Sequence, residues 1–362
     1  MRWIILKRAL PFVVLIFIGF FSLFSSFNCL TYLFQAGKGQ LQIMRNQEPI
    51  LSILADPKID LEIKNKLKHV QEIHKYAIEN LSLTPGKSYT TYVKIDREAV
   101  AWNVTACREL SFEEKKWWFP VVGTVPYLGF FNKEDAVVLE NSLKKEGWET
   151  QLRSISAYST LGWFNDPIFS TQMKHSEWYL TRLLIHEAAH STLWFPGDVQ
   201  FNESFASFVE ETGSLSYYKE KEGLQSNSYK NKVKYLKEIM RLNTIFTKYT
   251  ETLEEMYKSD ISLSLKRTRK IEIIENLRQE LKRASGSFEI IQLNQYDKFQ
   301  FNNAFFLSFR RYNSGTLFFQ NIFLESEGSW KIFLSKMKKL EKMKPEERNK
   351  LLKTADQIVT NF

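Results

Sequence analysis

Residues that cross-link a chain or coordinate metals are scarce in this sequence. Its 362 residues include two cysteines, Cys29 and Cys107, and five histidines. If Cys29 is lipidated or lies in a membrane, no intramolecular disulfide is available, and the fold must be held together by its core. A chain of this length with 15% aromatic residues can bury such a core. Because histidine is rare here, two histidines in one short motif are informative.

The sequence also lacks a long run of one charge sign. The formal net charge is +9, but 50 Lys and Arg residues are dispersed among 41 Asp and Glu residues. The densest basic stretches, 266–282 and 336–344, mix with acidic and apolar residues, which is typical of solvated helix faces. No internal repeat and no low-complexity segment is evident. These features argue against a nucleic-acid partner.

The motif His186-Glu187-Ala188-Ala189-His190 is the most informative part of the chain. It follows an apolar, helix-compatible run at 179–185. On a helix, residues four apart share a face, so both imidazoles can bind one metal ion. Glu187 lies one step round the helix, where it can act on a metal-bound water without being a ligand. The alternative is two histidines on an ordinary amphipathic helix.

A third ligand is predicted on the next helix. Pro196-Gly197-Asp198 breaks the first helix, and Asn202 is a good N-cap for the second. A helix-turn-helix hairpin can then bring Glu203 against the two histidines, and a His₂Glu set with an open fourth position is a known catalytic zinc site. The alternative for Glu203 is a first-turn acid that complements the helix dipole. Glu210 is a fallback ligand or a partner that orients a histidine.

Besides the His-Glu-x-x-His motif, residues 30–215 contain several other distinctive motifs. They are Gln-Ala-Gly-Lys-Gly-Gln-Leu at 35–41, Leu-Ala-Asp-Pro at 54–57, Trp-Phe-Pro-Val-Val-Gly at 118–123, Ala-Tyr-Ser-Thr-Leu-Gly-Trp-Phe-Asn-Asp-Pro at 157–167 and Phe-Asn-Glu-Ser-Phe-Ala at 201–206. With the His-Glu-x-x-His motif, they resemble the bacterial predicted-aminopeptidase family, a family of gluzincin-like zinc metallopeptidases. Asn-Asn-Ala at 302–304 fits this family more weakly.

The resemblance implies a peptidase that holds one Zn²⁺ ion. The run Asn202-Glu203-x-Phe205-Ala206 is similar to the run that carries the third zinc ligand in gluzincin aminopeptidases. The gap between His190 and this run is shorter than in well-known gluzincins, which predicts a tight connecting turn.

The N-terminus predicts export and membrane attachment. Arg2, Lys7 and Arg8 precede an apolar run at 9–24, which is the pattern of a secretory signal. Cys29 lies where a lipoprotein cysteine would, although large residues precede it. A lipid-modified Cys29 and an uncleaved N-terminal anchor remain open. Either alternative leaves the catalytic part membrane-anchored and facing the periplasm or the cell exterior.

The predicted fold class is α+β: a mainly helical, zincin-like metallopeptidase with a small mixed β-sheet before the metal-binding helix. Strands are predicted at 89–95, 102–106 and 150–158, a strand pair or a strand-bulge-strand at 121–131, a helix at 132–147, and long helices over 232–282 and 305–340. His69 and His74 are predicted at the surface. The predicted regions are a signal or anchor at 1–29, a metallopeptidase core at 30–215 and a helical C-terminal subdomain at 216–362.

Segment 154–159 is predicted to be the edge strand that binds a peptide substrate. In zincins, an edge strand just before the active-site helix lays the substrate backbone along the cleft, and Tyr158 and Ser159 would contact it. The alternative is an ordinary internal strand. Candidate donors for the oxyanion are Tyr158, His175, Tyr217, Tyr218 and Tyr312.

These features together predict a membrane-tethered, zinc-dependent aminopeptidase with Glu187 as general base. The competing hypothesis is a catalytically inactive, membrane-anchored peptide-binding or scaffold protein on the same fold. The sequence does not indicate an oligomeric state.

Overall fold

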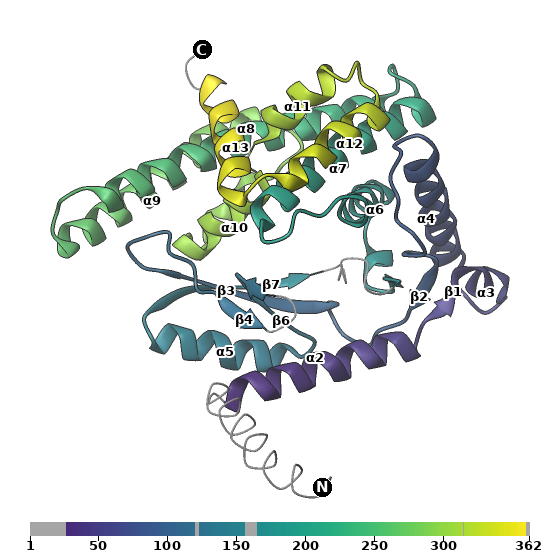
Figure 1. The fold of residues 1–362 in the computed structure, drawn as a ribbon, viewed down its shortest axis with the longest axis horizontal. Coiled ribbons are helices and arrows are strands. Elements are labelled where there is room, and N and C mark those ends of the chain that lie inside the picture. The colour runs from purple at the N-terminus through teal and green to yellow at the C-terminus, as the bar shows by residue number, and fades with distance from the viewer. Residues whose placement is uncertain (1–26, 120–122, 156–164, 314, 360–362) are drawn as a thin grey trace, which may run out of the picture.

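The computed structural model describes residues 27–119, 123–155, 165–313 and 315–359 (Figure 1). The predicted signal or anchor at 1–29 lies outside these residues except for its last three positions. Among the helices that are described, none is both long enough and apolar enough to cross a membrane.

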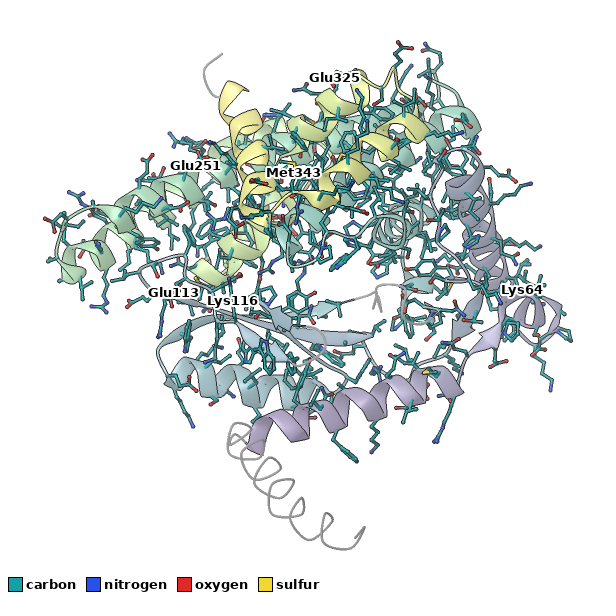
Figure 2. All side chains as sticks on the ribbon, in the orientation of Figure 1. Lys64, Glu113, Lys116, Glu251, Glu325 and Met343 are labelled. Carbon is teal, nitrogen blue, oxygen red and sulfur yellow. The ribbon has the colours of Figure 1, made fainter. Side chains whose placement is uncertain are left out.

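Helices dominate the fold and lie on both sides of a group of short strands (Figure 1). The helices are α2 (Phe27–Arg45), α3 (Ile50–Ala55), α4 (Leu61–Glu79), α5 (Lys133–Lys145), α6 (Glu177–Thr192), α7 (Val199–Glu222), α8 (Asn227–Lys258), α9 (Leu263–Ala284), α10 (Asn303–Asn313), α11 (Thr316–Leu324), α12 (Trp330–Lys339) and α13 (Pro345–Val359). The prediction of a mainly helical α+β chain is confirmed. Charged side chains such as Glu251 and Glu325 extend from the outside of the helical part (Figure 2).

The strands form three small sheets. They are β1 (Glu48–Pro49), β2 (Thr91–Val93), β3 (Ala101–Arg108), β4 (Trp117–Phe119), β5 (Gly123–Val125), β6 (Leu128–Phe130), β7 (Trp148–Ile155) and β8 (Ile168–Phe169). The sheet orders are β1-β2-β8, β6-β3-β7 and β4-β5. The first is mixed, since β2 pairs antiparallel with β1 and parallel with β8.

The predicted strand pair at 121–131 is corrected by this topology. Its two halves join different sheets: β5 pairs with β4, whereas β6 pairs with β3. Pro126 lies between the halves and has no N–H to donate to a ladder, which prevents continuous pairing across this point.

One face of the β6-β3-β7 sheet packs on α5. Side chains at alternating positions, such as Trp102 and Val104 on β3 and Leu152 on β7, contact Ala136 and Leu143 of α5. Because strand residues alternate between faces, the intervening residues of β7 point to the opposite side, where α10 lies. Asn132 begins α5 by accepting a hydrogen bond from the Glu134 N–H at 2.8 Å.

The C-terminal part is divided into shorter helices than the periodicity predicted. The expected helical stretch at 232–282 is a pair, α8 and α9, with a break at Ser259–Ser262. Ser259 ends α8, and the Ser262 side chain caps α9 by accepting from the Leu265 N–H. The stretch at 305–340 contains α10, α11 and α12. The apolar residues keep a helical spacing across the breaks, because the helices on both sides of each break bury an apolar face.

The largest hydrophobic core joins the two halves of the chain. It contains residues of α4, α6 and α7 together with Phe319, Phe333 and Leu352 from the last three helices. The predicted boundary between residues 215 and 216 falls inside α7. Gly213 on α7 allows close packing with α6, because a Cβ there would lie 2.8 Å from Leu81 Cδ1 and 3.2 Å from Ile185 Cγ2.

Candidate metal centre

Two consecutive helices carry the predicted ligands. Ser176 begins α6 by accepting a hydrogen bond from the Tyr179 N–H, and α6 ends at Thr192. Residue Asp198, whose side chain accepts from the Phe201 N–H, begins α7. The connection between the helices therefore spans only residues 193–198, in agreement with the tight turn that the sequence predicted.

Asn202 has a different role from the predicted one. It lies inside α7, because Asp198 caps the helix one turn earlier. The Asn202 amide is fully buried. It accepts from the Phe195 N–H and donates to the Phe195 carbonyl, both at 2.8 Å. Asn202 thus holds the turn between α6 and α7 and fixes the position of its neighbour Glu203.

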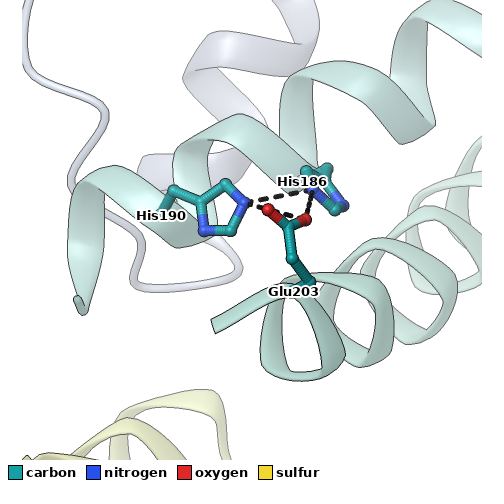
Figure 3. A group of neighbouring side chains, drawn as sticks. All are labelled: His186, His190 and Glu203. Carbon is teal, nitrogen blue, oxygen red and sulfur yellow. Dashed lines mark hydrogen bonds and ion pairs between the residues drawn. The ribbon is translucent and has the colours of Figure 1, made fainter. Parts of the chain in front are cut away.

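The side chains of His186, His190 and Glu203 converge on one point (Figure 3). The Nε2 atoms of the two histidines are 3.1 Å apart, and Glu203 Oε2 lies 3.4 Å from His186 Nε2 and 3.6 Å from His190 Nε2. Ligand atoms around a tetrahedral zinc ion, at about 2.0–2.2 Å from it, lie about 3.3–3.6 Å from one another. The three buried side chains could therefore hold a metal ion.

The electrostatics of the centre are those of a cation site. Burial acts against ionisation of Glu203, but the positive charge of His190 and hydrogen bonds from both histidines lower the pKa of Glu203 strongly. Burial also acts against a charge on His186, yet hydrogen bonds to Glu203 and Glu210 raise the pKa of His186 well above its usual value. The carboxylates thus retain a positive charge at a point that water hardly reaches.

Glu210 contacts the far side of the His186 ring. Its Oε2 atom lies 2.9 Å from His186 Nδ1, and its Oε1 atom is 2.6 Å from Arg182 Nη2. Nδ1 points away from the converging atoms, so Glu210 is placed to orient His186, and the open alternative of a fallback ligand has no geometric support. The Arg182 charge and the His186 hydrogen bond lower the pKa of Glu210 against the effect of burial.

We expect the Glu210→Gln variant to bind metal about 10- to 100-fold more weakly, because the carboxylate fixes the tautomer and the ring orientation of His186. Metal titration of the purified protein measures this change. Glu211→Gln, one position along α7, is the matched control and should leave the affinity within about threefold. Equal affinities for the Glu210 variant and the wild type would contradict the orienting role.

Glu187 is buried beside the metal ligands. Its carboxylate atom Oε2 has no hydrogen-bond partner among the described residues. Such an orphaned buried oxygen is unusual in a folded protein and is often functional. Burial, followed by the charge of Glu187, raises the pKa of Tyr89 well above its usual value, so this ring forms part of the wall near Glu187.

Other predicted residues are not brought to this centre. Tyr158 and Ser159 lie outside the described residues. The hydroxyl of Tyr217 donates to Glu72 at 2.6 Å, and Tyr218 contacts Thr181, so both face away from the ligands. His175 lies in an exposed turn and stacks on Tyr179.

The prediction that His69 lies at the surface is wrong. His69 is 4% exposed, and its Nε2 atom lies 2.8 Å from Thr181 Oγ1 on α6. Its polar sequence neighbours occupy the outer face of α4, whereas His69 points inward with Leu67 and Val70. Burial lowers the pKa of His69. The residue therefore couples α4 to α6 and is not part of the metal centre.

Two tyrosines that feel the charge of Glu203 come from distant parts of the chain, and an arginine lies over the ring of each. The charge of Glu203 and burial raise the pKa of Tyr312 on α10, and burial and Glu203 raise the pKa of Tyr127 to about 12. Arg311 lies over the Tyr127 ring and pairs with Glu114 at 3.0 Å. Arg153 of β7 lies over the Tyr312 ring. Only Tyr312 was among the candidates from sequence, because no local pattern marks the others.

The fold and this centre define a class: an α+β chain with a buried His₂Glu cluster that could hold a metal ion. The sequence model of the family described as “Putative aminopeptidase” matches residues 31–352, so the chain belongs to that family. This membership confirms the predicted aminopeptidase family, indicates peptidase activity and implies a peptide substrate. No curated protein and no solved structure gave a match.

Proposed function

We propose that this protein is a membrane-tethered, zinc-dependent aminopeptidase of the gluzincin type on a zincin-like fold. The observation that carries the proposal is the convergence of His186, His190 and Glu203 within 4.8 Å of one another, with Glu187 buried beside them. Two imidazoles and one carboxylate suit zinc in a catalytic site, which keeps an open coordination position.

A zinc ion bound there would act as a Lewis acid on the scissile carbonyl and make water a better nucleophile. Glu187 accepts a proton from the attacking water at its free Oε2 atom and then donates it to the leaving amine. Glu210 and Arg182 hold His186 in place. The proposed mechanism thus assigns a role to each of these residues: ligands for the ion, a base and an orienting partner.

Tyr312 is the best-placed donor for the oxyanion among the tyrosines that the sequence suggested. The charge of Glu203, followed by burial, raises the pKa of Tyr312, and the carbonyl of its neighbour Arg311 accepts from Ser204, next to Glu203, at 3.5 Å. We expect Tyr312→Phe to lower kcat about 100-fold with metal binding unchanged, because only the donated hydrogen bond is lost. Steady-state kinetics measures this. Tyr249→Phe on α8, whose hydroxyl contacts Glu280, is the control. Unchanged kcat in Tyr312→Phe would remove Tyr312 from the mechanism.

Membrane attachment at the periplasmic or exterior face is supported by the sequence of residues 1–29. The basic start and the apolar run at 9–24 precede α2, which begins at Phe27. Attachment there would leave the metal centre, more than 150 residues further along the chain, free to meet peptides.

Metal content and hydrolysis of the purified full-length protein test the proposal. We expect one zinc ion per chain and release of N-terminal residues from unblocked peptides, lost with a chelator and regained with Zn²⁺. Peptides with an acetylated N-terminus should resist cleavage, since an aminopeptidase recognises the free amine. A folded protein that binds no zinc contradicts the metal centre. Stoichiometric zinc and peptide binding without hydrolysis would favour an inactive binding or scaffold protein.

A further inference from the structure

Arg153 lies near the end of β7, an edge strand in the described part of the β6-β3-β7 sheet, and its guanidinium contacts the Tyr312 ring. Among the described residues, strand β7 pairs only with β3 in the sheet order β6-β3-β7, and Arg153 pairs there with Asn103. Glu149 shares a strand face with Arg153, and its carboxylate accepts from the Asn303 N–H at the start of α10 at 2.7 Å. Arg153 therefore also projects towards α10, away from the α5 core.

The spacing along α10 brings Arg153 to Tyr312. The four-residue step from Glu149 to Arg153 along β7 spans about 13 Å. The nine-residue step from Asn303 to Tyr312 along α10 spans about the same distance. The two elements thus run side by side, and Arg153 Cζ lies 5.7 Å from the centre of the Tyr312 ring.

Tyr312 in turn connects this arginine with the metal centre. The Oγ of Ser204, next to Glu203, donates to the carbonyl of Arg311 at 3.5 Å, which seats the end of α10 against α7. Ser204 directly follows Glu203 and Tyr312 directly follows Arg311, so this contact brings Glu203 and Tyr312 onto adjoining turns of α7 and α10. A substrate at the ligands would therefore meet the Tyr312 ring and then the guanidinium of Arg153.

The guanidinium has no counterion in the described part of the chain. No carboxylate there lies within 4.0 Å of Arg153, and segment 156–164 contains no acidic residue. The neighbouring Arg311 is buried and already paired with Glu114. Arg153 is exposed and keeps its five N–H donors available, in the planar arrangement that matches a carboxylate.

We propose that Arg153 binds a carboxylate of the substrate, and thereby selects peptides that carry one beyond the scissile bond. The inference rests on the proposed peptidase function and names its substrate class. The carboxylate has two sources, the C-terminus of a short peptide or an acidic side chain. A guanidinium held over an aromatic ring on an edge strand, next to the metal ligands, recognises either one by paired hydrogen bonds.

Three alanine-based peptides separate these sources. The first is a tripeptide with a free C-terminal carboxylate, the second is the same peptide with a C-terminal amide, and the third is an amidated peptide with one glutamate. We expect Arg153→Gln to raise KM for a carboxylate-bearing peptide about 10- to 100-fold, the size of a lost charge-assisted pair, with kcat within about threefold. KM for the uncharged amide should stay unchanged.

Matched variants and a binding measurement keep the result interpretable. Arg153→Lys should retain part of the preference, because it keeps the charge but not the planar pair of donors. Arg269→Gln, an exposed arginine on α9, is the control and should change neither KM. Calorimetric binding of the same peptides to the zinc-loaded Glu187→Gln protein repeats the comparison without turnover.

The outcomes distinguish this inference from the proposed function. A wild-type protein that cleaves all three peptides equally, or an Arg153→Gln variant that loses no discrimination, overturns the carboxylate site and leaves the peptidase intact. A protein without hydrolysis overturns the proposed function, while the binding comparison still decides the role of Arg153. Preference for the free C-terminus identifies short peptides as substrates, and preference for the glutamate peptide identifies acidic side chains.

Discussion

Replacing Glu187 with glutamine is expected to lower kcat by about 10²- to 10⁴-fold and to leave the bound metal unchanged. Glutamine has nearly the same size and retains a polar oxygen, but it cannot accept and pass on a proton at neutral pH. The Glu187 side chain lies beside the ligand cluster and is not one of its members. The measurement is kcat on an unblocked peptide, with the zinc content of the same sample.

Glu203→Gln is the matched comparison, because the same change of charge is made in a predicted ligand. This variant should lose both zinc and activity, whereas Glu187→Gln should lose activity alone. Activity that survives in a zinc-loaded Glu187→Gln protein would contradict the role of general base. Loss of zinc in that variant would instead indicate that Glu187 supports the metal centre itself.

Replacing Arg348 with methionine is expected to destabilise the protein by about 3–5 kcal/mol, because it leaves the buried charge of Asp198 without its ion-pair partner. Arg348 on α13 and Asp198 are 1% and 3% exposed, and Arg348 Nε lies 2.9 Å from Asp198 Oδ2. The guanidinium also donates to the carbonyl of Met343, at the entry to α13 (Figure 2), and packs over Phe195. The free energy of unfolding, from urea titration of the protein, measures the loss.

A double-mutant cycle isolates the pair. Arg348→Met with Asp198→Asn should be less destabilised than the sum of the single variants, since the second change removes the unpaired charge. Lys336→Met breaks the exposed pair with Glu325 and serves as the control, with an expected change below about 1 kcal/mol. Additive losses in the cycle would show that Arg348 and Asp198 are not energetically coupled.

The sequence predicted the centre well where its geometry is local. The helical spacing of His186 and His190 sets one face of α6, and the short break at 196–198 returns the chain so that Glu203 meets that face. Only about 18 residues are involved, so helix geometry and one turn determine the arrangement. The strands β3 and β7 and the helix α5 were found for the same reason, because their patterns are complete within a few residues.

Residues that reach the centre from far along the chain could not be found this way. Tyr127 comes from the bend between β5 and β6, and Tyr312 and Arg153 meet only because α10 lies along β7. His69 was misplaced because polar neighbours on α4 suggested an exposed face. The sequence predicts Asn202 as the cap and Asp198 only as part of the break, whereas Asp198 begins α7. The error at His69 concerns tertiary packing, whereas the error at Asn202 concerns which residue caps the helix within one turn.

The buried contact between Arg348 and Asp198 also sets when the metal centre can mature during synthesis. The two residues are separated by 150 positions, and Asp198 begins the helix that carries Glu203. At a translation rate of about 5–20 residues per second, roughly 8–30 s pass between the emergence of the two partners. The nascent chain therefore contains both histidines and Glu203 well before Arg348 is available to neutralise Asp198 at the start of α7. The metal centre therefore reaches its final geometry only after α13 has been synthesised.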